Sequence, residues 1–383
     1  TLGRCSRRGA PLRSVVRTFG IVLVLLMLPV AAEGQSLRGR PLERVDFRAL
    51  SKVLSHLSVP LRGVEVHTDR ESFIERGQRR EKHLAVWLVK GRIKGLAVVG
   101  HPLKSTTHVT ELEALEALVL VNTGIDRLKG LGGLSALDTL LVSGDRLVGL
   151  AGIGEVGSLK HLSLTFTHLE STKALAALTE LQSLSLAGNR LEDTLGLNKL
   201  TKLEILVLDD NRIRRLKGLS KLTALKHVSV ASNELDTLDG ASAWKRLESL
   251  DAAANRLDRV DGLGGLDHLE RLDLAGNRIA TTEGLDALGS LRHLDLRGNE
   301  LTSLEGLGGL SKLETLDVQV NRLESLEGLA GLKALAGLDA SGNRIKSMKG
   351  LESLTGLREL VLRQNAIGRI SGLSKTTGLR VLD

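Results

Sequence analysis

Leucine recurs along most of the chain in a pattern that repeats every 22 residues. In LERLDLAGNRI, residues 269–279, leucine or isoleucine stands at the first, fourth, sixth and eleventh places. With Leu269 as position 1, apolar residues or threonine continue at positions 14, 17 and 20, asparagine stands at 9 and glycine at 16. This register runs without insertion from 93 to 378 as thirteen full repeats, and 379–383 begin another. A fixed period of this length predicts a solenoid in which each coil is one repeat.

The spacing inside one repeat predicts its local structure. Positions 4 and 6 alternate around position 5, as side chains do in a short β-strand. Positions 11, 14, 17 and 20 step by three, which is the period of a 3₁₀-helix, and glycine at 16 permits a close bend. One unit cannot bury its leucines alone, so neighbouring units must stack. We expect an α/β solenoid with a parallel β-sheet on its concave face and a 3₁₀ or irregular convex side.

Asparagine at position 9 forms a column in nine successive repeats. Its amide can hydrogen-bond to backbone groups of its own turn and of the neighbouring turn. We expect these side chains to satisfy buried backbone that no strand or helix serves. The predicted structural column is Asn189, Asn211, Asn233, Asn255, Asn277, Asn299, Asn321, Asn343 and Asn365.

The segment LERLDLAGNRIATTEGLDAL resembles the 22-residue leucine-rich repeat of bacterial internalins and of the eukaryotic phosphatase-1 regulatory subunit. The resemblance covers 93–383, about three quarters of the chain. It implies a horseshoe whose concave strand face binds a protein partner. Internalins also carry a helical cap before the repeats and an immunoglobulin-like segment after them, and no such segment follows Asp383 in this sequence. Because the sequence begins at Thr1 and stops within a strand, we expect it to be a fragment.

Residues 33–92 lack the repeat register and are predicted to form an N-terminal capping segment. Asp46–Leu57 has the pattern of an amphipathic helix with Asp46 as N-cap. Two strands are expected over 63–68 and 83–100, and the second bends at Gly91. Such a cap would cover the leucines of the first repeat, which a solenoid otherwise leaves bare.

The N-terminal residues have the pattern of an export signal. Five arginines precede an apolar run over 19–32, and small residues follow at an expected cleavage point after Ala32 or Gly34. The run is shorter than the roughly 20 residues that span a membrane. We therefore expect a signal peptide over 1–32 and a protein that is secreted or held in the cell envelope, with an uncleaved membrane anchor as the alternative. The sole cysteine, Cys5, precedes the run, and export without disulfides is typical of a bacterial protein.

Charge argues against nucleic acid as the partner. The formal net charge is +8, and removal of the five arginines leaves +3, divided into +5 over 33–92 and −2 over 93–383. A nucleic-acid-binding solenoid would carry a basic stripe along the repeats.

Aspartate recurs at position 5 of five successive repeats, between the two buried leucines of each strand. Because positions 4 and 6 point inward, position 5 is expected to point out to the concave surface, exposed to solvent. Carboxylates on neighbouring strands would repel by about 1 kcal/mol per pair in water, with relief from nearby basic side chains. Two interpretations stay open: the aspartates are a structural feature of the repeat with solvated charges, or they form an acidic recognition surface with basic side chains beside it. A row of metal sites is disfavoured, because hard cations need about six converging oxygens. The candidate partner-binding residues are Asp251, Arg271, Asp273, Arg292, His293, Asp295, Arg297, Asp317 and Asp339.

A second candidate surface on the concave face is apolar. Its members fall at the outward positions 5, 7 and 8 of the first repeats, and exposed apolar patches often mark interaction sites. Alternatively, the capping segment folds over them. The candidates are Val99, Val119, Val121, Leu141 and Phe166.

No catalytic motif is evident. The chain has ten histidines but no HExxH, P-loop or GxSxG sequence, and nothing calls for a cofactor or a metal. We expect an exported, monomeric, non-enzymatic protein that binds a protein partner of unknown identity through its concave face. Two alternatives stay open: a structural or adhesive surface module of a larger chain, and an intracellular scaffold similar to the phosphatase regulator.

Overall fold

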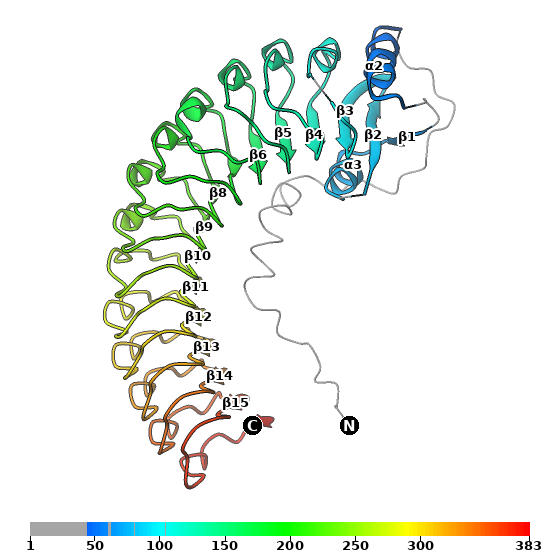
Figure 1. The fold of residues 1–383 in the computed structure, drawn as a ribbon. Coiled ribbons are helices and arrows are strands. Elements are labelled where there is room, and N and C mark those ends of the chain that lie inside the picture. Colours follow the sequence, from blue (N-terminus) through cyan, green and yellow to red (C-terminus); the bar gives the residue numbers. More distant parts are fainter. Residues whose placement is uncertain (1–43, 60–62, 80, 104) are drawn as a thin grey trace. The chain divides into compact units, whose positions relative to one another are not determined.

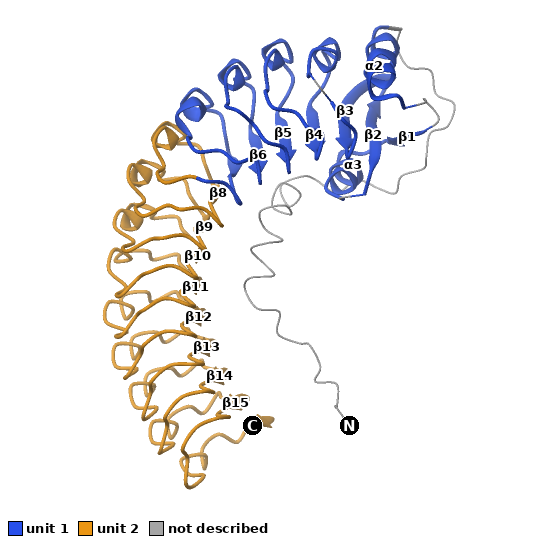
Figure 2. Cartoon of the chain, viewed as in Figure 1, with its two compact units in different colours: residues 1–190 blue, residues 191–383 orange. Residues whose placement is uncertain are grey.

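The computed structural model describes residues 44–59, 63–79, 81–103 and 105–383 (Figure 1). The expected signal peptide, with its alternative as an anchor, lies outside the described residues. The chain divides into two compact units, residues 1–190 and 191–383 (Figure 2). Among the described residues no helix combines the length and apolarity required to cross a membrane.

The first unit begins with a cap of two helices and three strands. Strand β1 pairs in parallel with β2, and β2 pairs antiparallel with β3 through a tight turn at Lys90 and Gly91, whose φ angles are 48° and 79°. Strand β3 contains positions 1 to 7 of the first repeat, so one strand belongs to both the cap and the solenoid. The elements are α2 (Arg44–Leu57), β1 (Val64–His67), α3 (Arg70–Gly77), β2 (His83–Val89) and β3 (Arg92–Val99).

Asp46 joins helix α2 to the first repeat. It lies in the first turn of the helix, so our prediction that it caps the helix is wrong. Its fully buried carboxylate accepts hydrogen bonds from the backbone N–H of Ile93 at 2.7 Å and from the Arg92 side chain at 3.0 Å. Ile93 is position 1 of the first repeat, so this contact holds the cap against the open end of the core.

The remaining coils of the first unit each place one strand on the inner side and one 3₁₀-helix on the outer side (Figure 1). Strands β3 to β7 pair in parallel with their neighbours, and each residue pairs with the residue 22 positions later. The strands are β4 (Ala117–Val121), β5 (Thr139–Ser143), β6 (His161–Thr165) and β7 (Ser183–Ser185). The 3₁₀-helices are η2 (Val109–Glu111), η3 (Leu131–Gly133), η4 (Ile153–Glu155) and η5 (Lys173–Ala177).

The second unit repeats this arrangement with shorter strands. Its pairs are parallel and in 22-residue register, as between Asp251 and Asp273. Three 3₁₀-helices are followed by irregular turns on the outer side: η6 (Leu197–Lys199), η7 (Leu219–Lys221) and η8 (Ala241–Ala243). The strands are β8 (Ile205–Val207), β9 (His227–Ser229), β10 (Ser249–Asp251), β11 (Arg271–Asp273), β12 (His293–Asp295), β13 (Thr315–Asp317), β14 (Gly337–Asp339), β15 (Glu359–Val361) and β16 (Val381–Leu382).

The core contains the side chains that the 22-residue spacing predicts to be buried. In the repeat that begins at Leu269, positions 1, 4, 6, 11, 14, 17 and 20 are all at most 1% exposed. Position 16 adopts a left-handed backbone, for example at Gly328 with φ of 101°, where a Cβ would lie 2.5 Å from the carbonyl oxygen of Leu304. Only glycine allows this approach between coils. The parallel inner sheet and the 3₁₀ or irregular outer side confirm the predicted α/β solenoid.

The asparagine side chains connect successive coils. The Asn277 amide NH₂ donates to the carbonyl oxygens of Ala252 in the preceding repeat, at 3.0 Å, and of Leu274 in its own, at 2.9 Å. Its oxygen accepts from the N–H of Leu257 at 3.0 Å. One buried side chain thus pairs three backbone groups that lie beyond the end of the strand.

Strand length changes where this column begins. Strands β4, β5 and β6 extend through position 7, as the pairing of Val121 with Ser143 shows. The repeats of these strands carry Thr123, Asp145 and Thr167 at position 9. From β7 to β15 the strands end at position 5. This change sets the environment of the aspartate column.

Candidate protein-interaction surface

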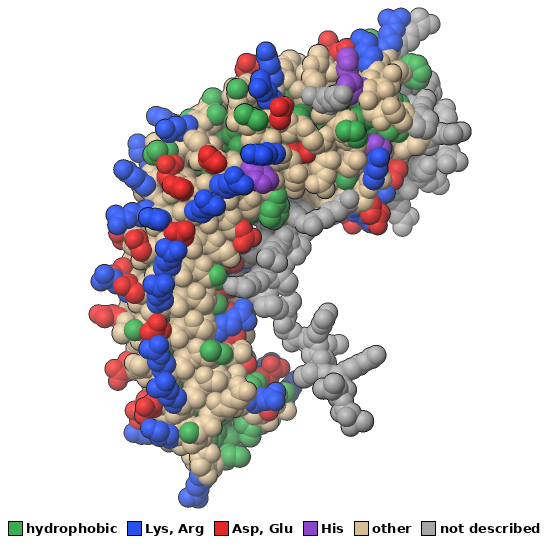
Figure 3. Space-filling view, in the orientation of Figure 1, with side chains coloured by type: hydrophobic (Ala, Val, Ile, Leu, Met, Phe, Trp, Pro, Cys, Tyr) green, Lys and Arg blue, Asp and Glu red, His purple; other side chains and the backbone are tan. Residues whose placement is uncertain are grey.

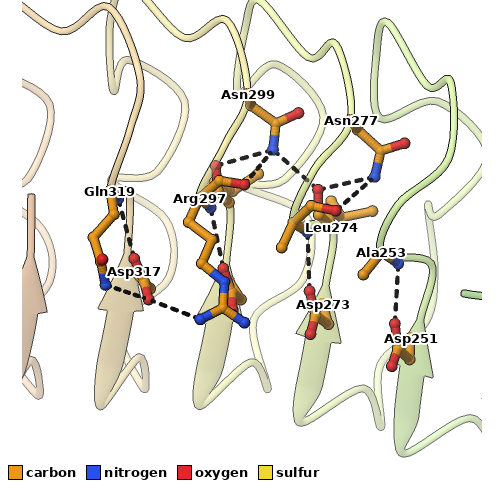
Figure 4. A network of polar contacts seen from close by, with 12 residues as sticks. Asp251, Ala253, Asp273, Leu274, Asn277, Arg297, Asn299, Asp317 and Gln319 are labelled. Atoms are coloured by element: carbon orange, nitrogen blue, oxygen red, sulfur yellow. Dashed lines mark hydrogen bonds and ion pairs between the residues drawn. The ribbon is translucent and has the colours of Figure 1, made fainter. Parts of the chain in front are cut away.

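The aspartates of position 5 accept backbone hydrogen bonds within their own repeats (Figure 4). The carboxylate Oδ1 of Asp273 accepts from the N–H of Ala275 at 2.9 Å, and Asp295 accepts from Arg297 at 3.1 Å. The same contact to the residue two places later occurs at Asp251, Asp317 and Asp339, each at 3.0 Å. All five carboxylates therefore have the same structural role, which is to accept the backbone N–H of position 7.

Our prediction that these aspartates stand exposed is wrong for three of them. Asp251, Asp273 and Asp295 are 1%, 0% and 5% exposed, and Asp317 and Asp339 are half-buried. The alternation of a strand fails here because the strand ends at position 5. Each carboxylate then turns to the N–H of position 7, which no longer takes part in the strand pairing.

The asparagine column explains why that N–H needs an acceptor. In a continuing parallel ladder, the N–H of Arg297 would pair with the carbonyl oxygen of Leu274. That oxygen already accepts from Asn277 at 2.9 Å and from Asn299 at 3.0 Å (Figure 4). The carboxylate of Asp295 replaces it as the acceptor.

A repeat without aspartate at position 5 solves the same problem in another way. Ser229 stands at position 5, and the N–H of Ala231 at position 7 donates to the Asp209 carboxylate of the preceding repeat at 3.0 Å. The Ser229 hydroxyl donates to the same carboxylate. The backbone N–H of position 7 thus needs an acceptor whether or not position 5 is aspartate. This favours the interpretation of the aspartate column as a structural feature.

Arg297 bridges two carboxylates of the column. Its guanidinium lies 3.2 Å from Asp295 and 4.0 Å from Asp317, and the side-chain amide of Gln319 donates to Asp317 at 2.9 Å (Figure 4). Burial, followed by the charges of Asp273 and Asp317, nevertheless raises the pKa of Asp295 to about 7. Burial also raises the pKa of Asp317 to about 6, with Asp339 adding to the effect. Protonation near neutral pH relieves the repulsion within the column.

The basic candidates beside the column lie nearer to solvent. Arg271 and Arg292 are exposed and His293 is half-buried. Arg292 forms an ion pair with Glu314, and the His293 ring is 2.8 Å from the Thr315 hydroxyl. Burial, followed by the charge of Arg271, lowers the pKa of His293 and so favours the neutral ring. The Arg292 and His293 side chains thus each contact the following repeat, at Glu314 and Thr315.

The apolar candidates of the first unit do not form an exposed patch. Val99 and Val119 are 0% exposed and Val121 is 6% exposed, and Leu141 is partly buried against them. Helix α3 covers them with Phe73 and Ile74, as part of one buried cluster. The alternative that the capping segment folds over these residues therefore holds, and only Phe166, at 50% exposure, remains open.

Helix α3 was not expected from the sequence. Gly95 in β3 leaves room for it, because a Cβ there would lie 2.7 Å from the Phe73 ring. Arg70 at its start forms an ion pair with Asp138 and donates to the Thr139 hydroxyl at 2.7 Å. Its guanidinium also lies 5.8 Å from the centre of the Trp87 ring. The helix thus occupies the strand face of the first coils.

Among the described residues, no three His, Cys, Asp or Glu side chains come together as metal ligands do. The aspartate column extends along the sheet and does not converge on one point. The second unit instead carries a row of aspartates across parallel strands, with exposed basic side chains beside it.

Comparisons with known proteins agree with the fold. Leucine-rich repeat family models match residues 245–301 and 290–331. An internalin, InlF, of Listeria monocytogenes is similar in structure over 75% of this chain and 86% of its own, with 24% identity and a TM-score of 0.69. A leucine-rich-repeat protein of Leptospira interrogans is similar over 76% of this chain and 83% of its own, with 23% identity and a TM-score of 0.63.

A third similar structure is that of the LRIM1/APL1C complex, which has 22% identity and a TM-score of 0.63 over 80% of this chain and 59% of the matched one. A search of curated proteins gives no match. The chain therefore carries leucine-rich repeats and has the leucine-rich-repeat fold. Solenoids of this kind have an extended inner surface.

Proposed function

We propose that this is an exported, non-enzymatic protein that binds a protein partner through the concave strand face of its second unit. The observation that carries the proposal is that buried and exposed polar side chains have different roles across strands β11 to β13. The aspartates serve the backbone, whereas Arg271, Arg292 and Thr315 stand exposed in the same strands or directly beside them. Exposed charged and polar side chains on a sheet face give an interface its specificity and its orientation.

Export is supported by the sequence of the N-terminal residues alone. Five arginines, a 14-residue apolar run and small residues at a cleavage point fit a secretory signal. A periplasmic or extracellular partner would meet the solenoid there. The similar proteins described above include a complex, which supports a protein as the partner.

The proposal is tested by capture of the partner with the purified protein and with a variant of its strand face. The variant combines Arg271→Gln and Arg297→Gln, which removes charge and retains hydrogen bonding. We expect a protein captured by the wild type to be lost or weakened at least tenfold. Lys333→Gln is the matched control, because Lys333 is exposed in the turn between strands β13 and β14. A partner retained by the double variant and lost by the control would contradict the proposal.

A further inference from the structure

Phe166 is a large aromatic side chain that the fold leaves half in solvent. It is 50% exposed, in a chain that has only four phenylalanines and in which leucine is the main residue of the core. It follows strand β6 at position 8 of its repeat. Burial of this ring in the core of the first unit is therefore not the reason for its presence.

The backbone of Phe166 is also strained. Position 8 is left-handed throughout the first unit, with φ of 66° at Gly100, 50° at Asn122, 75° at Gly144 and 70° at Gly188. Glycine and asparagine tolerate this region, whereas a bulky side chain is an outlier there. Phe166 has φ of 55°. The second unit has the same conformation at position 8, for example at Val320 with φ of 52°, so the left-handed backbone belongs to the repeat and the aromatic side chain is what distinguishes Phe166.

The next coil provides a seat for the ring. Gly188 is the position-8 residue of the following repeat, and a Cβ there would clash with the Phe166 ring. The ring therefore lies against a bare stretch of backbone, and half of its surface stays open to solvent. This arrangement presents a rigid aromatic surface at little cost in side-chain freedom.

Three basic side chains lie in the coil of Phe166 and in the two neighbouring coils. Arg146, His168 and Arg190 occupy position 10 of three successive repeats, and all three are exposed. Positions 8 and 10 flank the buried position 9 at the strand-end edge, in coils about 4.8 Å apart. Arg146 has no ion pair within the described part of the chain, and Arg190 lies 3.9 Å from Glu170. On the face shown in Figure 3, basic side chains line up along successive coils.

We propose that Phe166, with Arg146, His168 and Arg190 beside it, anchors an acidic segment of a protein partner that carries an apolar side chain. The exposed face of the ring takes the apolar group, and the basic side chains pair with the carboxylates around it. The inference rests on the proposed function only in taking the partner to be a protein. It adds a contact at the strand-end edge of the first unit.

Nucleic acid is the less favoured occupant of this edge. A single aromatic ring offers one stacking platform, whereas proteins that bind single strands use several along a basic groove. An oligonucleotide is nevertheless a useful probe, because it shares the negative charge and lacks the apolar side chain.

The test is a selection of random 12-residue peptides on the full chain, followed by fluorescence titration of the enriched peptides. We expect them to combine Leu, Phe or Trp with several Asp or Glu residues. Phe166→Gly should weaken their binding at least tenfold, and Arg146→Gln about threefold. Glycine occupies the same position in neighbouring coils, so Phe166→Gly should melt at or above the wild-type temperature. Val148→Ser, at a residue 72% exposed in the same unit, should bind as the wild type does.

Several outcomes would overturn this inference. They are the selection of no peptide, selection of peptides without acidic residues, equal binding by Phe166→Gly, and equally tight, Phe166-dependent binding of oligo-dT. If the selected peptides respond to Arg271→Gln and Arg297→Gln and not to Phe166→Gly, the inference fails and the proposed function stands. If Phe166→Gly weakens peptide binding and the captured partner still binds the Arg271→Gln, Arg297→Gln variant, the inference stands and the proposed function fails.

Discussion

The side-chain amide of Asn299 donates a hydrogen bond to the carbonyl oxygen of Leu274, one repeat earlier, over 3.0 Å. This contact removes the acceptor that a continuing β-ladder would offer to the next coil. The strand consequently ends, and Asp295 accepts the N–H of Arg297 instead. Asparagine at position 9 and aspartate at position 5 therefore act together: the first occupies the carbonyl of position 6, and the second accepts the N–H of position 7 that this carbonyl would have paired.

Loss of Asn277 is expected to destabilise the second unit. Asn277→Ala leaves the buried N–H of Leu257 without its acceptor, and an unsatisfied buried backbone group costs about 1–3 kcal/mol. The free energy of unfolding in urea, followed by circular dichroism, measures the loss. Asn365→Ala is the control, because Asn365 is half-exposed and water can replace its contacts, so its cost should be smaller. An Asn277→Ala variant that unfolds with the wild type would contradict this account of the column.

Two substitutions of Asp295 separate its hydrogen bond from its charge. Asp295→Ala removes the acceptor for Arg297 N–H and should cost about 1–3 kcal/mol. Asp295→Asn keeps an acceptor oxygen and removes the repulsion from Asp273 and Asp317, so stability should hold or rise. Unfolding in urea compares the two variants at pH 7.5. If Asn is as damaging as Ala, the charge itself is required and the interpretation of the column as a structural feature fails.

Stability should depend on pH through Asp295 and Asp317. Their pKa values are raised from 3.8 to about 7 and about 6, so the folded protein binds protons more tightly than the unfolded chain does. Stability from these groups is therefore greatest below about pH 4, falls as the pH rises to about 7, and is level above that. One pKa unit corresponds to about 1.4 kcal/mol, so a fall of at least about 1 kcal/mol is expected.

The difference between two unfolding series isolates this effect. Measured from pH 4 to pH 8, the wild type should lose stability relative to Asp295→Asn with Asp317→Asn, in which the two groups cannot titrate. Equal pH profiles for the two proteins would show that these carboxylates titrate normally in the folded state.

Export predicts a processed N-terminus. The mature protein should begin near Glu33 or Gln35, because small residues end the apolar run there. N-terminal sequencing of protein from fractionated cells of the native host gives the result. Recovery from the cytosol with Phe19–Ala32 intact would contradict the secretory interpretation, and recovery from the membrane with it intact would indicate an anchor.

The repeat was predictable because its signal is periodic and redundant. Leu272 and Leu274 are two of seven core positions that recur every 22 residues, and each proved to be buried. The asparagine contacts could also be anticipated, since an amide at a buried turn has backbone groups as its main available partners.

The errors have a common physical origin in contacts between segments distant in the sequence. The burial of Asp273 follows from the hydrogen bonds that Asn255 and Asn277 donate to the Ala252 carbonyl of the preceding repeat, which alternation within one strand cannot reveal. Helix α3 buries only Phe73, Ile74 and Gly77, too few residues for a visible helical period. The packing of this helix over Val119 depends on Gly95 and on Asp138, and neither residue stands out in the sequence.

The measurement that tests the central claim most directly is site-specific photo-crosslinking in the native host. A benzoylphenylalanine replaces Arg271 on the strand face of the second unit or, in a second protein, Lys333 in the turn outside the strands. We predict a discrete crosslinked product with one protein partner from position 271 and none from position 333. Crosslinking from position 333 alone, or from neither position, would contradict the claim that this strand face binds the partner.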